Sequence, residues 1–187
     1  HFANDIIPEM LQAKDRFYGY VFEDYWAYCG TVDEYWQANM DIIREDSEIS
    51  PESWGIRQNM EENVRGTKLM ADRPPARFAT GCKVNCSMIS AGCVIEGDVS
   101  RSVLSPGVHV KPGAVVRNSI LFHDCVVEKD ARIDLAILDK RAKVSEAAVV
   151  GYGDDKETVN VQHPSHLYTG ITLVGKEVAV PEKARIG

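Results

Sequence analysis

The sequence lacks a hydrophobic run long enough to cross a membrane, and we expect no signal peptide. Positive charge is also scarce, because 21 Lys and Arg residues stand against 28 Asp and Glu residues and give a formal net charge of −7. An acidic chain does not provide the positive field that nucleic acids and anionic membranes require. We therefore expect a cytoplasmic protein with neither kind of partner.

Cysteines with paired or metal-type spacing are missing as well. The five cysteines are an odd number, and we expect them to be reduced thiols. With 187 residues, 44% of them hydrophobic, the chain is large enough for one domain or one and a half. It begins at His1 rather than Met and ends within the repeat described next, so we expect a fragment of a longer protein.

A period of seventeen residues runs through the second half of the chain. Large aliphatic residues lie six apart within each set, and each set recurs seventeen residues later. The residue two places before each of them is small. The three sets are Leu104, Val110 and Val116; Leu121, Val127 and Ile133; and Leu138, Val144 and Val150. One small and one large inward position in every six residues are typical of the hexapeptide repeat of a parallel β-helix.

The same pattern extends in both directions, with less even spacing upstream. Its large inward residues there are Phe78, Val84, Ile89, Ile95 and Val99, and downstream they are Val174, Val180 and Ile186. The alternative, a β-sandwich, predicts period two with turns about every 8–12 residues and no phase-locked longer period. Cys82, Cys93 and Cys125 fall at small inward positions and act there as small hydrophobic residues. Cys93 and Cys125 lie two coils apart, about 10 Å, which is beyond disulfide reach.

The first forty-five residues lack this period. We predict a short helix over 5–13 with Asp5 as its N-cap, and a strand over 17–22. A capping box, Thr31-x-x-Glu34, opens a second helix that runs to about residue 45. Its apolar residues, which form one stripe along the helix, are Tyr35, Trp36, Met40 and Ile43.

We divide the chain into three parts. Residues 1–45 are too few for a core of their own, so we expect them to be part of a larger unit. Residues 46–73 are a linker, and residues 74–187 are the β-helix, interrupted by an inserted loop over 151–170. Long polar loops on such scaffolds are often functional, although a plain surface excursion is equally compatible with the sequence. The loop residues that could touch a ligand are His163, His166 and Tyr168.

Five segments spread along the whole chain carry a family resemblance. They are "FANDIIP", "YWAYCGTVDEYWQANMDII", "RPPARF", "SVLSPGVHVKPGAVV" and "GITLVGKEVAVPEKARIG". In this order they resemble glucose-1-phosphate adenylyltransferase, also called ADP-glucose pyrophosphorylase. The resemblance implies the last part of a nucleotidyltransferase catalytic domain, followed by a linker and a left-handed β-helix.

The resemblance also implies an activity and its partners. The family joins ATP and glucose 1-phosphate into ADP-glucose and diphosphate for glycogen biosynthesis, with Mg²⁺. It forms homotetramers, and sugar-phosphate or nucleotide effectors bind near the junction with the β-helix. The family's Gly-rich phosphate loop, whose backbone N–H groups hold the triphosphate, has no counterpart in these residues. We therefore expect the chain alone to be inactive, with its β-helix serving oligomerisation and regulation.

One position departs from the family pattern, which is roughly Tyr-Trp-x-Asp-x-Gly-Thr with a metal-handling Asp. Tyr28 stands at that position, and a phenol is a poor ligand for a hard cation. The full-length protein is then a weakened regulatory-type subunit, an enzyme whose metal is held by Glu23 or Asp24, or a side branch with altered chemistry. The resemblance places Tyr25 and Trp26 near the sugar pocket, with core packing as the alternative. We expect no metal site within this chain.

Basic residues close to the linker are candidates for binding an effector phosphate, or they are ordinary solvated charges. They are Arg65, Lys68, Arg73, Arg77 and Lys83. A hexapeptide acyltransferase, which uses a histidine base between subunits, is the alternative of another class. His109 is expected to point outward and His123 to lie at a corner, and neither is accompanied by an arm for an acyl-carrier substrate.

Overall fold

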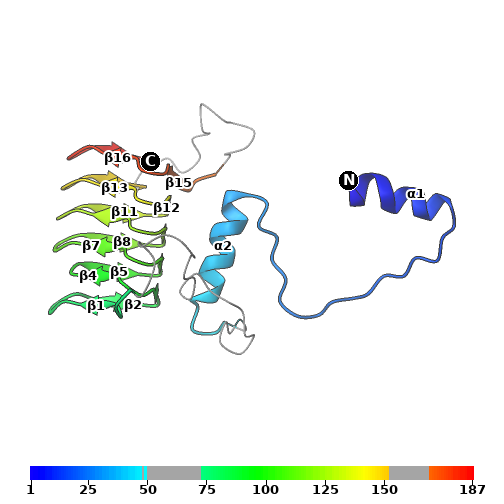
Figure 1. The fold of residues 1–187 in the computed structure, drawn as a ribbon, viewed down its shortest axis with the longest axis horizontal. Helices are drawn as coiled ribbons and strands as arrows, with labels where there is room; N and C mark the ends of the chain where they lie inside the picture. The colour runs from blue at the N-terminus through cyan, green and yellow to red at the C-terminus, as the bar shows by residue number, and fades with distance from the viewer. Residues whose placement is uncertain (48, 50–72, 152–168) are drawn as a thin grey trace.

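The computed structural model describes residues 1–47, 49, 73–151 and 169–187. Its C-terminal part is a parallel β-helix whose coils stack in one direction, with helix α2 lying against one side (Figure 1). Each of the first five coils contributes one short strand to each of three parallel sheets, and the last coil contributes β16 and β17 to two of them. The β-helix predicted from the repeat is therefore confirmed.

The strands are two or three residues long, and every third strand along the chain joins the same sheet. The first sheet holds β1 (Arg77–Phe78), β4 (Val94–Ile95), β7 (His109–Val110), β10 (Val126–Val127), β13 (Lys143–Val144) and β16 (Ala179–Val180). The second holds β2 (Val84–Asn85), β5 (Asp98–Ser100), β8 (Val115–Arg117), β11 (Arg132–Asp134), β14 (Val149–Val150) and β17 (Arg185–Ile186). The third holds β3 (Met88–Ile89), β6 (Val103–Leu104), β9 (Ile120–Leu121), β12 (Ala136–Leu138) and β15 (Thr172–Val174).

The pairing register follows the repeat residue by residue. Leu104 pairs with Leu121, Leu121 with Leu138, and Leu138 with Val174 after the inserted loop. The chain therefore returns from the insertion to the column that the sequence predicted. The uneven spacing upstream is real, because Ile95 pairs with a residue only fifteen positions ahead, Val110.

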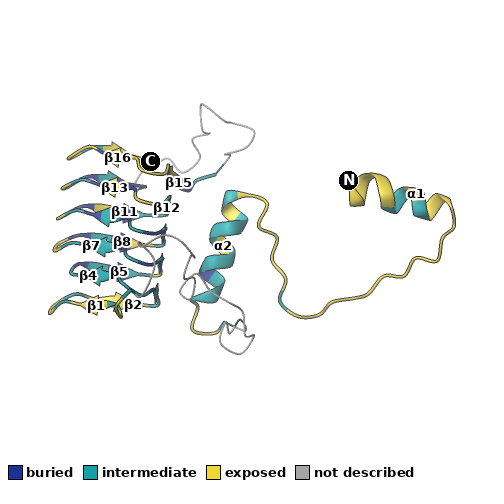
Figure 2. Ribbon diagram, in the orientation of Figure 1, coloured by how far each residue is buried: buried dark blue, intermediate teal, exposed yellow. Residues whose placement is uncertain are grey.

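The core consists of the predicted large and small residues. The small positions are fully buried from Ser102 to Ala148, and the aliphatic column beside them is buried as well (Figure 2). Cys93 and Cys125 are 0% exposed, Cys82 packs against the same core, and all five cysteines are free thiols. Burial raises the pKa of Cys125 to about 12, so it remains a neutral thiol at physiological pH.

Serines at the small positions form a buried hydrogen-bonded ladder between coils. The hydroxyl of Ser102 accepts from the backbone N–H of Ser119 at 3.2 Å, and the hydroxyl of Ser119 accepts from that of Ala136 at 3.1 Å. Each hydroxyl also donates to the carbonyl two residues earlier in its own coil. The ladder satisfies backbone donors that the tight corner leaves without a strand partner.

The N-terminal part differs from the expectation in detail. The first helix is a π-helical turn, Phe2–Ile6, that continues into α1 (Ile7–Gln12). Asp5 therefore lies inside the helix and is not its N-cap, because the turn begins three residues earlier. The strand predicted over 17–22 is wrong: this segment is exposed and has no strand assignment. A short apolar segment forms a strand only where another strand pairs with it, and no described residue does so here.

Helix α2 (Val32–Ile42) ends three residues before the predicted residue 45 and packs on the third sheet (Figure 1). Met40, at 3% exposure, lies in one cluster with Ile120, Ile137 and Ile171. The predicted stripe of the helix is thus its buried face. Trp36 adds a directional contact, because its indole N–H donates to the carbonyl of Asn118 at 2.7 Å.

Two predicted features lie mainly outside the described residues: the linker over 46–73 and the inserted loop over 151–170, with His163, His166 and Tyr168. No helix in the described part of the chain is long and apolar enough to cross a membrane.

Replacing Ser119 with Ala should lower the free energy of unfolding by about 1–3 kcal/mol, because the buried N–H of Ala136 loses its acceptor. Urea unfolding followed by circular dichroism measures this difference. Ser145→Ala is the matched control. That serine also lies in a coil of the β-helix, but its hydroxyl makes no hydrogen bond to any described residue. Equal stability of the two variants would contradict a structural role for the ladder.

Candidate functional site

The aromatic stretch, residues 24–30, leads into α2 at Thr31. The capping box predicted there is confirmed. The backbone N–H of Glu34 donates to the hydroxyl of Thr31 at 3.2 Å, and the carboxylate of Glu34 accepts from the backbone N–H of Thr31 at 3.1 Å. These bonds satisfy two orphan donors at the helix start. They also fix the angle at which residues 24–30 leave the helix.

Tyr25 is bound to the last turn of α2. Its hydroxyl donates to Asp41 Oδ2 at 3.1 Å, while Asp41 Oδ1 accepts from the side-chain amide of Gln37 at 2.7 Å. Burial, followed by the hydrogen bond to Asp41, raises the pKa of Tyr25 above its usual value. The phenol therefore stays protonated at neutral pH and continues to donate to the carboxylate.

A cavity of about 290 Å³ opens beside this bond. Its walls carry a phenol, two carboxylates, a guanidinium and a hydroxyl, which can donate to or accept from the hydroxyl groups of a sugar. The guanidinium of Arg44 is held by Asp46 through bonds of 2.9 and 2.7 Å. The residues lining the cavity are Tyr25, Asp41, Arg44, Asp46, Ser47 and Ile49.

Trp26 and Tyr28 form an exposed stacked pair. Their ring centroids are 6.3 Å apart with an interplanar angle of 14°, and the side chains are 72% and 59% exposed. The ring of Tyr28 also lies over Gly30, where an added Cβ would fall 2.2 Å from ring atoms. Packing of Trp26 in a core, the alternative raised from the sequence, is therefore not seen among the described residues.

Tyr28 stands where the family pattern has its metal-handling Asp. Tyr28 offers an exposed phenol engaged with Trp26. No group of three or more His, Cys, Asp or Glu side chains suited to a metal occurs in the described part of the chain. The donor set that a hard divalent cation requires is thus not formed by these residues.

The predicted effector residues do not form one cluster in the described structure. Arg77, on β1, and Lys83, just before β2, are exposed. Arg73 is instead directed to Asp124, with contacts of 2.7 and 3.0 Å from its two terminal nitrogens. Arg65 and Lys68 lie outside the described residues.

The route of the Arg73 side chain explains two glycines. Gly92 and Gly107 occupy one corner column with Asp124, and all three have positive φ. A Cβ on Gly107 would lie 1.6 Å from Arg73 Nη1, and one on Gly92 would lie 2.9 Å from Cδ. The glycines leave a path along which Arg73 reaches across the coils and anchors the end of the linker.

The two histidines considered for an acyltransferase occupy different environments. His109 points outward as expected, and its Nε2 lies 2.8 Å from Glu96 Oε2. His123 is buried at 6% exposure.

Asp41 and Asp124 are the residues that sequence reasoning missed. A carboxylate in the last turn of a helix opposes the helix dipole, and this oddity could have marked Asp41 as having a partner. Asp124 lies seventeen residues after Gly107, in the same column. That spacing could have marked it as a corner residue but not as the partner of Arg73.

The β-helix defines the class of protein. Residues 74–174, more than half of the chain, match the family described as "GlmU-like, C-terminal hexapeptide". The chain belongs to this hexapeptide family.

The relatives of the whole chain are more specific. A glucose-1-phosphate adenylyltransferase of Thermomicrobium roseum is 41% identical over 189 residues, which cover 100% of this chain and 41% of the relative. One from Acetivibrio thermocellus is 34% identical with the same coverage, and one from Desulforamulus reducens is 31% identical over 80% of this chain and 36% of the relative. The chain thus spans about two fifths of the length of these relatives and matches their C-terminal hexapeptide region, as the sequence resemblance predicted.

Replacing Gly107 with Ala should destabilise the chain by about 2 kcal/mol more than replacing Gly81, because only the first change displaces the Arg73–Asp124 pair. Gly81 is the matched control, since its φ is also positive but nothing lies within 4 Å of an added Cβ. Urea unfolding of both variants measures the difference. The excess should disappear in an Arg73→Ala, Asp124→Ala background, because the added Cβ also falls 2.3 Å from Asp124 Oδ1. Its persistence there would show that the glycine has another role.

Proposed function

We propose that the chain is the C-terminal part of a glucose-1-phosphate adenylyltransferase, which forms ADP-glucose and diphosphate from ATP and glucose 1-phosphate in glycogen biosynthesis. The observation that carries this proposal is the match of the relatives over the whole chain, including the aromatic stretch outside the β-helix. An acyltransferase would share the hexapeptide coils alone.

In this proposal the aromatic stretch and α2 contribute to the sugar side of the active site. Tyr25 and the cavity beside Asp41 offer hydrogen-bonding groups, and Trp26 offers an exposed ring of the kind that stacks on a sugar. Mg²⁺ and the phosphate loop belong to the full-length enzyme. The described residues do not bring three metal-type side chains together, so Glu23 or Asp24 would hold the metal only together with other residues of the full-length enzyme.

The β-helix serves in this proposal as an oligomerisation and regulatory module of a cytoplasmic homo-oligomer, a tetramer as in the family. An anionic effector, a sugar phosphate or nucleotide, would meet Arg65, Lys68, Arg77 and Lys83. Arg73 contributes only if the effector replaces Asp124 as its partner. Support comes from the exposure of Arg77 and Lys83 at the first coil, next to the linker.

A chimera tests the proposed function. The matched segment of the Thermomicrobium roseum enzyme is replaced by this chain, and ADP-glucose formation is measured with ATP and glucose 1-phosphate. We expect turnover within about tenfold of the parent and the same oligomeric state, while the 187-residue chain alone forms no detectable product. A folded chimera of the correct oligomeric state that stays inactive even with Tyr28→Asp would contradict the proposal, as would activity of the isolated chain.

Tyr28→Asp in the same chimera distinguishes the three interpretations of the aromatic stretch. Restoring the family carboxylate should change turnover by less than about tenfold if Glu23 or Asp24 holds the metal or if the branch has altered chemistry. A gain of about a hundredfold or more would show that Tyr28 silences the site. Tyr28→Phe is the control, because it keeps the ring over Gly30 and adds no ligand.

A further inference from the structure

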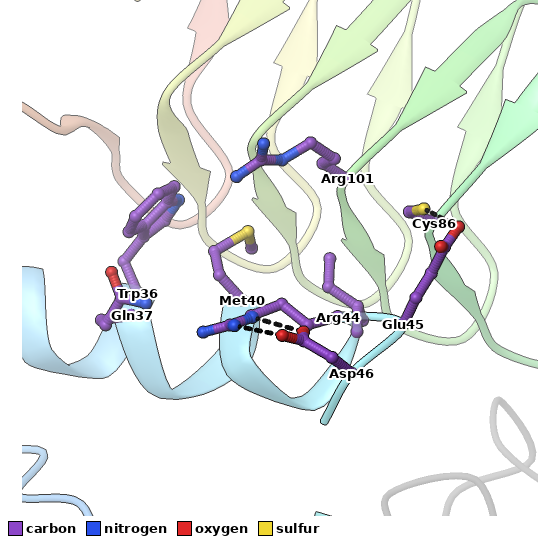
Figure 3. A pocket seen from close by; sticks show the side chains of 9 residues that line it. Trp36, Gln37, Met40, Arg44, Glu45, Asp46, Cys86 and Arg101 are labelled. Atoms are coloured by element: carbon purple, nitrogen blue, oxygen red, sulfur yellow. Dashed lines mark hydrogen bonds and ion pairs between the residues drawn. The ribbon is translucent and has the colours of Figure 1, made fainter. Parts of the chain in front are cut away.

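A second cavity, of about 440 Å³, lies where the end of α2 faces the first coils of the β-helix (Figure 3). One wall is formed by α2 and the residues that follow it, and the other by the corner residues Cys86 and Arg101. Its volume is in the range of small-molecule sites. It is distinct from the cavity beside Tyr25, although Arg44 and Asp46 line both.

The α2 wall of this cavity carries three apolar side chains, Trp36, Met40 and Ile43. The rest of this wall is polar and consists of Gln37, Arg44, Glu45 and Asp46. The indole of Trp36 is oriented by its bond to the carbonyl of Asn118, and Met40 is anchored in the cluster between α2 and the third sheet. A fixed aromatic and thioether surface favours a flat apolar ligand, since little side-chain entropy is lost on binding.

Among the described residues that line the cavity, Arg101 is the cation without a carboxylate partner. Arg44 is neutralised by Asp46 in a two-bond ion pair, and the carboxylate of Glu45 accepts from the thiol of Cys86 at 3.4 Å. No carboxylate pairs with Arg101 in the described part of the chain. Figure 3 shows its side chain extending from the β-helix toward Met40 and Trp36.

We propose that this cavity binds a small organic monocarboxylate with a flat apolar body. The guanidinium of Arg101 presents parallel N–H donors that match the two oxygens of a carboxylate. The body of the ligand then lies against Trp36 and Met40. The site joins α2 to the β-helix, so an occupant contacts both.

The same charges argue against ligands with several negative groups. The cavity wall carries Glu45 and Asp46 as well as the two arginines, so its net charge is close to zero. A single carboxylate at Arg101 balances a cation that has no carboxylate partner among the described residues. A second anionic group on the ligand would lie near the carboxylates of Glu45 and Asp46, and no further cation would neutralise it there. This binding site does not depend on the proposed function and can be tested without catalysis.

Benzoate is the probe for the experiment on the 187-residue chain. Calorimetric titration should give one benzoate per chain, and acetate, benzamide and inorganic phosphate should each bind at least tenfold more weakly, because each lacks the flat body or the single charge. Benzoate should also slow alkylation of Cys86, which lines the cavity, without changing that of the exposed Cys29. Phosphate or acetate binding as tightly as benzoate would overturn the proposal.

Arg101→Gln should weaken benzoate binding by about tenfold to a hundredfold, since a charged hydrogen-bond pair is lost. The matched control is Arg132→Gln, which removes an exposed arginine on β11 that does not line the cavity and should leave binding unchanged. Circular dichroism confirms that both variants remain folded. Unchanged binding in Arg101→Gln, or no binding to the folded parent chain, would show that the cavity is not this site.

Discussion

The coil-to-coil register of the β-helix is the constraint on which the remaining structure depends. Parallel pairing puts residues seventeen apart directly above one another, so a single aliphatic position becomes a continuous column. The space at each corner then favours a small residue, and Val108 is the largest that it holds between Ser102 and Ala148. This is why Ser102, Cys125 and Ala148 are equally buried although their chemistry differs. Where the small residue is serine, its hydroxyl adds a hydrogen bond to the next coil.

The same register organises the outer surface. On the third sheet it aligns Val103, Ile120 and Ile137, which form an apolar outward column, and α2 covers this column. On the first sheet the corresponding outward column includes His109 and Lys143, and charged side chains pair there instead. Helix α2 therefore covers the outward column that is apolar without a break, whereas His109 and Lys143 interrupt the column of the first sheet that also holds Val94 and Val126.

The sequence predicted the coils well because the repeat is a long-range pattern that few other folds produce. It also predicted the capping box and the buried stripe of α2, since both depend on local spacing. The strand predicted over residues 17–22 was wrong, because a strand requires a pairing strand and the local sequence does not show whether one is present. Contacts between distant segments, such as Arg73 with Asp124 or Tyr25 with Asp41, were likewise hidden, because they depend on how corners and helix ends meet in space.

Helix α2 connects the β-helix to the aromatic stretch because its two faces have different partners. One face is fixed to the third sheet by Met40 and by the bond from Trp36 to Asn118. The other holds the hydroxyl of Tyr25 through Asp41. A rigid helix of eleven residues transmits any rotation about its axis to both faces. The position of the aromatic stretch is consequently set by the β-helix as well as by the capping box, and a ligand between Arg101 and Trp36 would act on the same helix.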